Sequence, residues 1–506
     1  MKDLQRDKEF WTKSSQHEVV VPVGWDINHK EVCFEIGNEQ NHTLICDHSG
    51  SGKSNFLHVL IQNLAFYYAP NEVQLFLLDY KEGVEFNAYV ADTALEHARL
   101  VSVASSISYG ITFLKWLCDE MEKRADRFKQ FKVKDLSDYR KHEKMPRLIV
   151  VVDEFQVFFS NSNKETDAVN KYLTDLLKKG RSYGIHLILA TQTMRDTNIS
   201  SSLKAQIANR IALPMDAEDS DSVLGDDAAC ELVRPEGIFN NNGGHQKYHT
   251  KMSIPKAPDD FKSFLTKIHA EFNQRNLAPI DRKIYNGETP LKMPNTLKAD
   301  EMRLHLGKKV DYDQKDLIVE FESNESHLLV VSQDLNARIA LMKLLFQNIK
   351  SANKELVFCN KEKRLIRFFD APKEYGITPV ENILSVLDTA MNPNSALVID
   401  NLNEAKELHD KAGVEKLKSF LEKATDNEQY CVIFAHDFRQ IKTNYHFDKL
   451  KELLNNHFKQ CLAFKCNGEN LNAIKSDLPP PSRLNALLIE LSKDSHTEFR
   501  PFSLQD

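Results

Sequence analysis

Cysteine, excess basic charge and long apolar runs are all scarce in this chain of 506 residues. Its eight cysteines are scattered singly, and the closest pair, Cys461 and Cys466, lacks C-x-x-C spacing, so we expect free, buried thiols. No apolar run is long enough to span a membrane and the first residues are polar, which predicts a cytoplasmic protein without a membrane segment. The net charge of −7 excludes a uniformly basic coat for nucleic acid, but it allows a local basic stripe.

The most informative stretch present is a loop of small residues at 47–54. A short apolar run at 44–46 precedes it, and a helix with one apolar side is expected over 55–69. Strand, glycine loop, Lys-Ser and helix in this order predict a cradle for a nucleoside triphosphate, because glycines let backbone N–H groups face phosphate and the helix N-terminus favours anions. The nucleotide-binding residues that we expect are Asp47, His48, Ser49, Gly50, Ser51, Gly52, Lys53, Ser54 and Asn55.

Two side chains of this loop have specific expected roles, and one position departs from the pattern. Lys53 is expected to reach the β- and γ-phosphates of ATP, and the Ser54 hydroxyl to hold Mg²⁺. Asp47 stands where the pattern G-x-x-x-x-G-K-[ST] has its first glycine. Asp tolerates the left-handed backbone better than most residues, so we expect the loop to close around Asp47. An ordinary Gly/Ser turn before a helix is the alternative.

A second informative stretch runs from Arg147 to Glu154. Five consecutive apolar residues predict a buried central strand, and its carboxyl end is where α/β sheets place their ligands. We expect Asp153 to hold Mg²⁺ together with Ser54, and Glu154 to polarise the water that attacks the γ-phosphate. The alternative is an acidic strand end in solvent. The position of this stretch, a hundred residues after a Lys-Ser loop, disfavours that alternative.

Two further residues are candidates for the same reaction. A strand expected at 187–190 leads into Thr191-Gln192, where Gln192 is placed to sense the γ-phosphate or to orient water. Arg181 precedes that strand on a loop, as an arginine donated to a neighbouring subunit's phosphate must. An ordinary surface cation is the commoner reason for such an arginine.

A long helix expected at 107–132 has a basic second half. This half could face DNA or a neighbouring subunit, and a solvated helix face is the simpler alternative. Its basic residues, with those that follow, are Lys123, Arg124, Arg127, Lys129, Lys132 and Lys134.

Four blocks of sequence together resemble the FtsK/SpoIIIE family of motor ATPases, which belongs to the wider FtsK–HerA group of RecA-like hexameric motors. The blocks are residues 47–54, 79–81, 150–155 and 184–192, and Gly-Ile-His-Leu-Ile-Leu-Ala-Thr-Gln at 184–192 discriminates best. The resemblance covers roughly residues 20–250. It implies ATP hydrolysis at the subunit interfaces of a ring, coupled to movement of double-stranded DNA, although similar domains in type VII secretion ATPases move protein.

The resemblance also assigns two arginines. It implies that Arg181 is the arginine finger given to a neighbouring subunit, and that Arg210 supports the interface. One departure weakens the assignment to the chromosome-segregating branch, because Thr193-Met194-Arg195 replaces the Arg-Pro that usually follows Thr-Gln in DNA translocases.

The second half of the chain repeats the first half in degenerate form. Residues 327–341 align without a gap with residues 42–56, at an offset of 285. Internal similarity at a fixed offset favours a second RecA-like domain over an unrelated α/β domain. The substitutions at this offset remove the Mg²⁺ hydroxyl and the glycines that admit phosphate, and they are Gly50 to Leu335, Gly52 to Ala337, Lys53 to Arg338 and Ser54 to Ile339. Residues 396–401 separately resemble the acidic strand, with Asn401 in the place of Glu154.

The predicted fold class is α/β, with two tandem RecA-like P-loop domains that have mainly parallel central sheets flanked by helices, the second domain being degenerate. The expected bounds are an extension at 1–20, the active ATPase domain at 21–252, a linker with one helix at 253–299 and the degenerate domain at 300–506. The predicted function is an ATP- and Mg²⁺-dependent motor that forms a homo-oligomer and translocates double-stranded DNA. A protein-translocating ATPase and a nucleotide-switched scaffold are the alternatives, and partners from a defence or secretion system are possible under each.

Overall fold

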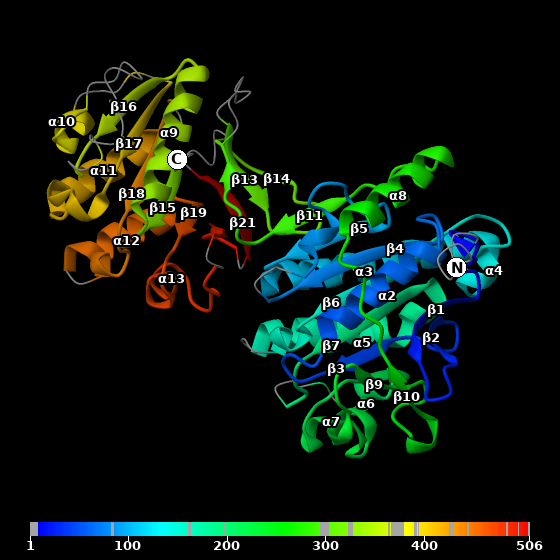
Figure 1. Cartoon of the computed structure of the whole chain (residues 1–506). Helices are drawn as coiled ribbons and strands as arrows, with labels where there is room; N and C mark the ends of the chain where they lie inside the picture. Colours follow the sequence, from blue (N-terminus) through cyan, green and yellow to red (C-terminus); the bar gives the residue numbers. More distant parts are fainter. Residues whose placement is uncertain are drawn as a thin grey trace. The chain divides into compact units, whose positions relative to one another are not determined.

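The computed structural model divides the chain into two compact units, Met1–Gly287 and Glu288–Asp506, whose elements are labelled in Figure 1. None of the described helices combines the length and apolar character that crossing a bilayer requires. The residues that the structure describes are 9–81, 85–159, 163–195, 199, 201–293, 303–321, 327–362, 365, 379–388, 392, 394–424, 427, 429–442, 445–481, 484–493 and 495–503.

The first unit is built on an eleven-stranded sheet with the order β11-β5-β4-β6-β7-β3-β8-β9-β10-β1-β2. The strands from β11 to β8 in this order are parallel, and the remaining four pair in antiparallel fashion. The predicted phosphate strand β3 therefore lies inside the parallel part. The strands are β1 Glu18–Trp25, β2 Glu31–Gly37, β3 Thr43–Cys46, β4 Val73–Asp79, β5 Ala98–Val103, β6 Arg147–Asp153, β7 Ile185–Thr191, β8 Asn209–Ala212, β9 Glu236–Asn240, β10 His249–Ser253 and β11 Lys283–Asn286.

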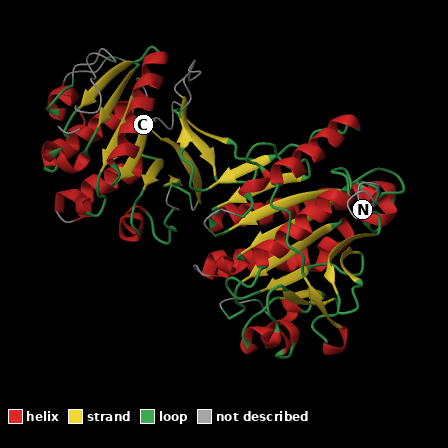
Figure 2. Cartoon of the chain, viewed as in Figure 1, coloured by secondary structure: helices red, strands yellow, loops and turns green. Residues whose placement is uncertain are grey.

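The helices of this unit confirm those expected from the sequence, with small shifts at their ends. The helix after the glycine loop begins at Lys53, two residues earlier than expected. Figure 2 shows helices packed along the strands of each unit. The helices of the first unit are α2 Lys53–Tyr67, η2 Asn87–Tyr89, α3 Ile107–Phe131, α4 Leu136–Tyr139, η3 Phe155–Phe159, α5 Asn163–Lys179, η4 Gly180–Tyr183, α6 Ser201–Lys204, α7 Ala217–Leu224, η5 Ala228–Glu231, η6 Gln246–Tyr248 and α8 Phe261–Gln274.

Both faces of the parallel strands are covered, which explains their continuous apolar sequences. Ile149 and Val151 of β6 belong to a core shared with α2 and α8. Alternate side chains of a strand point to opposite faces. Phe76 of β4 accordingly packs on the other face against Phe113 of α3, with 5.5 Å between the ring centroids.

Part of the segment expected to link the domains, residues 253–299, belongs to the first unit. Leu265, Ile268 and Phe272 of α8 are buried in its core. Strand β11 extends the sheet by pairing in parallel with β5. The first compact unit consequently runs to Gly287.

The basic residues in and just after the second half of α3 do not all lie on an exposed face. Arg124 is the exception. Arg124 is buried, and its Nη1 donates to the carbonyl oxygens of Pro146 and Tyr183 at 3.0 and 2.8 Å. The other five basic residues of the stretch are exposed. The eight cysteines are free as predicted, but Cys33 and Cys118 are half-buried and Cys230 is exposed, so the expectation of burial was wrong for these three.

The second unit carries a ten-stranded sheet with the order β14-β13-β21-β20-β19-β15-β18-β17-β16, with β12 pairing to β21. Strand β15 lies between β18 and β19, just as β3 lies between β7 and β8. Next come β17 and β16, matching β6 and β4 of the first unit. The strands are β12 Leu291–Lys292, β13 Arg303–Lys309, β14 Asp316–Glu320, β15 His327–Ser332, β16 Glu355–Cys359, β17 Ser395–Ile399, β18 Tyr430–Ala435, β19 Gln460–Phe464, β20 Ala486–Glu490 and β21 Ser495–Ser503.

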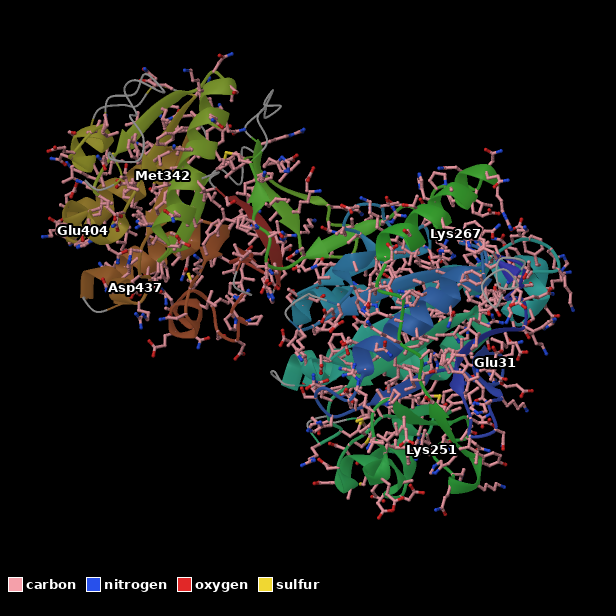
Figure 3. The ribbon with its side chains drawn as sticks, in the orientation of Figure 1. Glu31, Lys251, Lys267, Met342, Glu404 and Asp437 are labelled. Atoms are coloured by element: carbon pink, nitrogen blue, oxygen red, sulfur yellow. The ribbon has the colours of Figure 1, made fainter. Side chains whose placement is uncertain are left out.

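The helices of the second unit complete its core. Met342, labelled in Figure 3, is fully buried on α9, where it belongs to the core that α9 shares with β15. The shared strand order supports the inference from sequence that the two halves are related. The helices are α9 Leu335–Ser351, α10 Ile383–Asp388, η9 Leu402–Glu404, η10 Lys406–Leu408, α11 Lys411–Ala424, η11 Gln440–Lys442, α12 Tyr445–His457 and α13 Gly468–Ile474.

Three fully buried histidines, His42, His97 and His186, lie in the first unit. Burial lowers the pKa of His42 to about 3 and that of His97 to about 4. Nε2 of His97 donates to the carbonyl oxygen of Tyr68 at 2.7 Å. Because these folded-state pKa values lie below the ordinary value of 6.5, the unfolded chain binds protons at a higher pH than the folded chain does. Their contribution to stability is complete above pH 6.5 and is lost as the pH falls toward the folded-state values.

Replacing His97 with Gln keeps a donor for the Tyr68 carbonyl and removes the titrating ring. We expect the free energy of unfolding to fall less steeply with acidification in H97Q than in the wild type, by up to about 1.4 kcal/mol per pH unit. Urea unfolding between pH 6.5 and 4, followed by tryptophan fluorescence, measures this. The signal reports the first unit alone, because Trp11, Trp25 and Trp116 are the chain's three tryptophans. Equal slopes would contradict the burial of a neutral His97.

Candidate functional site

The loop between β3 and α2 depends on two glycines for its backbone path. Gly50 has φ 85° and Gly52 has φ 118°, conformations that side chains with a Cβ rarely adopt. Asp47 itself is outside the left-handed region and does not use the tolerance of aspartate for that conformation. Its N–H instead donates to the carbonyl oxygen of Thr191 at 3.2 Å, which joins the loop to β7.

The Asp47 carboxylate is turned into the loop. Oδ2 accepts a hydrogen bond from Ser51 Oγ at 2.8 Å, and Oδ1 lies 3.9 Å from Lys53 Nζ. Burial raises the pKa of Asp47 to about 6, while the Lys53 charge opposes that rise. The residue in the place of the first glycine therefore bonds within the loop and adds to the negative charge around Lys53.

Lys53 is the buried cation at the centre of the site. Its Nζ lies 2.6 Å from Asp153 Oδ1 and 2.8 Å from Glu154 Oε1, and its side chain is 5% exposed. Burial by itself would lower the pKa of Lys53, but the neighbouring carboxylates outweigh burial and raise it. The lysine is thus held in its charged form at the end of the acidic strand, as the sequence spacing predicted.

Glu154 is held on both carboxylate oxygens. Oε1 contacts Lys53 and accepts from Gln192 Nε2, and Oε2 accepts from Gln156 Nε2 at 2.6 Å. Burial favours the neutral acid, but Lys53 and these amides lower the pKa of Glu154 and keep it ionised. Its backbone has φ 57°, the left-handed region, which is strained for a glutamate and occurs mostly at functional sites.

A cavity of about 240 Å³ opens where the loop, the acidic strand and the end of β7 meet. Three predicted residues, His48, Ser51 and Arg181, do not line it. Ser51 supports Asp47, and the His48 N–H donates to Pro214 O at 3.1 Å. The predicted residues that line the cavity are Asp47, Ser49, Gly50, Gly52, Lys53, Ser54, Asn55, Asp153, Glu154 and Gln192.

Sequence reasoning missed four residues of the site. Lys81, Glu85 and Arg234 line the cavity, and Gln156 holds Glu154. Lys81 belonged to a recognised block, and its place two residues after β4 was a usable signal. No sequence signal indicated Arg234, because only the fold brings it close to Gly52. In the part of the chain that the structure describes, Arg234 makes no hydrogen bond or ion pair.

The donors present fit a nucleotide with Mg²⁺. A Cβ added at Gly50 would meet nothing within 4 Å, so this side of the loop is open, and α2 has no side-chain cap on its first N–H groups. Those groups are free to contact phosphate. The hydroxyl of Ser54 and the carboxylate of Asp153 are oxygen donors of the kind Mg²⁺ takes, with phosphate and water as its other ligands. In the described chain no three His, Cys, Asp or Glu side chains could hold a metal by themselves.

The two arginines assigned by resemblance lie away from the cavity. Arg181 is exposed on η4, before β7 begins, and its Nη1 donates to Asn38 O at 3.3 Å. Gln192 follows the opposite end of β7, roughly 20 Å away at the usual rise per residue. Arg210 is half-buried on β8, and its Nη1 donates to Val223 O at 2.5 Å.

The corresponding place in the second unit is closed to phosphate. Only two residues separate β15 from α9, so the connection is too short to form a phosphate-binding loop like that at residues 47–52. The carboxylate of Asp334 caps α9 by accepting from the N–H groups of Asn336 and Ala337 at 2.9 and 3.3 Å. Arg338, in the place of Lys53, is buried and paired with Glu362 at 2.6 Å. The N–H groups of α9 and the guanidinium of Arg338, which could otherwise bind an anion, are thus already paired with carboxylates of the chain itself.

Solved structures share the fold of the whole chain. It aligns over 98% of both chains with EssC (ATPases 2 and 3) from Geobacillus thermodenitrificans, at a TM-score of 0.59 and 14% identity. It also aligns over 98% of its length, and 94% of the other chain, with Thermomonospora curvata EccC (ATPases 2 and 3) in complex with a signal sequence peptide, at a TM-score of 0.61 and 14% identity. These alignments confirm the predicted fold of two tandem RecA-like domains.

Sequence relatives are of two kinds. The ESX secretion system protein YukB of Bacillus subtilis (strain 168) is 28% identical over 270 residues, which are 50% of this chain and 17% of YukB. The DNA translocase FtsK of Borreliella burgdorferi is 30% identical over 220 residues, which are 42% of this chain and 27% of that protein. The matches thus span less than a third of either relative.

The FtsK/SpoIIIE family itself matches residues 1–259, just over half of the chain. The matched region contains the glycine loop, the acidic strand and the strand that ends before Gln192. The chain therefore belongs to the FtsK/SpoIIIE family of P-loop ATPases.

Proposed function

We propose that the first unit binds and hydrolyses ATP with Mg²⁺, and that hydrolysis drives movement along a polymer. The contact of one buried lysine, Lys53, with both Asp153 and Glu154 carries this proposal. A lysine that can bind phosphate, a carboxylate that can bind a cation and a glutamate with a lowered pKa line one cavity, which supports the proposal. A structural ion pair would need neither the strained backbone of Glu154 nor an open glycine loop beside it.

Different residues of the chain have different roles in the proposed phosphoryl transfer. Gly50 and Gly52 shape the loop around phosphate, and Lys53 compensates phosphate charge. Ser54 and Asp153 would hold Mg²⁺, which would neutralise the charge that develops on phosphate during transfer. Glu154 accepts the proton of the attacking water. Gln156 and Gln192 fix its two oxygens, so the base is oriented before water is activated.

The position of Arg181 supports self-association. At one strand length from its own cavity, it cannot contact phosphate bound there. Its exposure before β7 suits an arginine that enters the cavity of a second copy. We propose that copies assemble, as the predicted ring would, with Arg181 completing the neighbour's site. Arg210, whose guanidinium bonds to Val223 O, would support this edge of the subunit.

Double-stranded DNA is the first candidate for the moved polymer. The 30% identity of the ATPase region to a DNA translocase supports it. A protein substrate is the second candidate, supported by the identity to an ESX secretion system protein and by the tandem arrangement shared with EssC and EccC. A partner from a defence or secretion system would recruit the motor in either case.

Glu154→Gln should reduce the ATP turnover rate by about 100-fold or more and leave ATP binding intact. The amide cannot accept the proton of water, while it retains the shape of the side chain. Steady-state phosphate release and binding of a fluorescent ATP analogue measure the two effects. Asp126→Asn, on the exposed face of α3, is the matched control. If E154Q hydrolyses at the wild-type rate, Glu154 is not the base. If the wild type binds ATP but does not hydrolyse it under any condition, the result favours the alternative of a nucleotide-switched scaffold.

Arg181→Ala should abolish hydrolysis, and mixing should restore it. R181A subunits retain an intact cavity, whereas Lys53→Ala subunits retain an intact Arg181. A mixture of the two inactive variants should therefore hydrolyse ATP, because some cavities receive an arginine from their neighbour. Phosphate release from each variant and from the mixture measures this. Lys178→Ala removes another exposed cation nearby and should retain activity. A mixture as inactive as its components would contradict donation between subunits.

The polymer can be identified by what stimulates hydrolysis. If DNA is moved, linear duplex DNA should raise the ATPase rate, and the stimulation should fall steeply between 50 and 200 mM salt, roughly as expected for counterion release. Phosphate release with duplex DNA, single-stranded DNA and no polymer at several salt concentrations measures this. Indifference to DNA together with stimulation by a candidate export peptide would favour the protein substrate.

A further inference from the structure

The hydroxyl of Ser54 has an acceptor that no sequence pattern indicated. Its Oγ donates to Oε1 of Glu85 at 2.6 Å, and both residues line the cavity. Glu85 comes from the segment after β4 and Ser54 from the first turn of α2. A distance this short is typical of a hydroxyl bonded to an ionised carboxylate.

Glu85 is in turn held by a side chain from the next turn of α2. Nε2 of His58 lies 3.5 Å from Glu85 Oε2, and its Nδ1 lies 3.0 Å from the hydroxyl oxygen of Tyr89. Tyr89 is fully buried, and its ring packs edge-on against Phe261. The hydrogen bond from His58 is the main reason that the pKa of Glu85 lies below its usual value. A chain of contacts from the core thus fixes an ionised carboxylate beside Ser54.

This arrangement matches what a hydroxyl needs in order to bind a cation. A hydroxyl ligand offers a lone pair to the cation, so its proton must point elsewhere, to an acceptor. A group that hydrogen-bonds to a metal ligand orients that ligand, and loss of the group typically lowers metal affinity 10–100-fold. The Ser54 proton already points to Glu85, which leaves the oxygen lone pairs for the cavity that Asp153 also lines.

We infer that Glu85 is a positioning residue for Mg²⁺ binding, acting through Ser54 and fixed by His58 and Tyr89. The inference rests on the proposed function, in which Ser54 is a ligand of Mg²⁺ bound with the nucleotide. Lys53, Lys81 and Arg234 line the same cavity as Glu85.

Magnesium titrations of nucleotide binding test this inference. The probe is a slowly hydrolysed, fluorescent ATP analogue, bound by the full chain at increasing Mg²⁺ and, separately, in EDTA. Glu85→Ala should raise the Mg²⁺ concentration for half-maximal binding about tenfold or more. It should leave affinity in EDTA within about twofold, because no direct contact to phosphate is lost. Glu85→Gln retains an oxygen that accepts from Ser54, so it should recover most of the Mg²⁺ dependence.

A double-mutant cycle separates action through Ser54 from other effects. In the Ser54→Ala background, Glu85→Ala should cause no further change in the Mg²⁺ requirement. Thermal unfolding followed by tryptophan fluorescence shows whether each variant folds. If Glu85→Ala does not fold, Glu85→Asp keeps the inference testable, because its shorter side chain withdraws the acceptor from Ser54 and should also raise the Mg²⁺ requirement. Asp126→Ala is the control for loss of a carboxylate elsewhere in the unit.

The possible failures are distinguishable. If the wild type does not bind the analogue with Mg²⁺, the proposed function fails and this inference fails with it. If the wild type binds but Glu85→Ala leaves the Mg²⁺ requirement unchanged, the inference alone is overturned. Equal losses of affinity with Mg²⁺ and in EDTA would also overturn it, since they would show that Glu85 supports the cavity as a whole. Additive losses in the Ser54→Ala background would exclude action through Ser54.

Discussion

The buried ammonium group of Lys53 is the interaction on which the site depends. Carboxylates in a space with little water lose hydration, and neighbouring carboxylates repel one another. Lys53 compensates Asp153 and Glu154 directly and Asp47 at longer range. Burial still raises the pKa of Asp153, whereas that of Glu154 is lowered, so the ionised base is the better compensated of the two. The cation that we propose to contact phosphate therefore also lowers the pKa of Glu154, the proposed base.

The second unit shows the same strand order with its charges paired internally. Arg338 has one carboxylate partner, Glu362, which also accepts from Asn401 Nδ2 at 3.3 Å. Asp334 satisfies the helix N-terminus that phosphate would otherwise contact. A buried charge pair and a capped helix are self-sufficient, so this unit can retain its fold without a nucleotide.

Local sequence patterns predicted the strands, the glycine loop and the acidic strand end because each is a property of a few adjacent residues. Lys53 and Asp153 were both predicted for one nucleotide site, and the structure brings them together because parallel strands have their carboxyl ends at one edge of the sheet. Arg234 and Glu85 could not be found in this way, because the fold brings them to the cavity from outside the recognised motifs. The backbone path at Asp47 depends on a contact outside the motif, because its N–H donates to Thr191 O and the left-handed positions of the loop are glycines.

The left-handed backbone of Glu154 has a consequence for how such a chain diverges. A non-glycine residue in this conformation is strained by about 1–2 kcal/mol, and glycine or asparagine would relieve most of it. For Glu154, the proposed base, selection for stability alone would favour replacement, whereas selection for turnover would retain it. Asn401 holds the equivalent position in the second unit, with an extended backbone at φ −157°. Once a copy of the fold is released from hydrolysis, the residue at this position is among the first expected to relax.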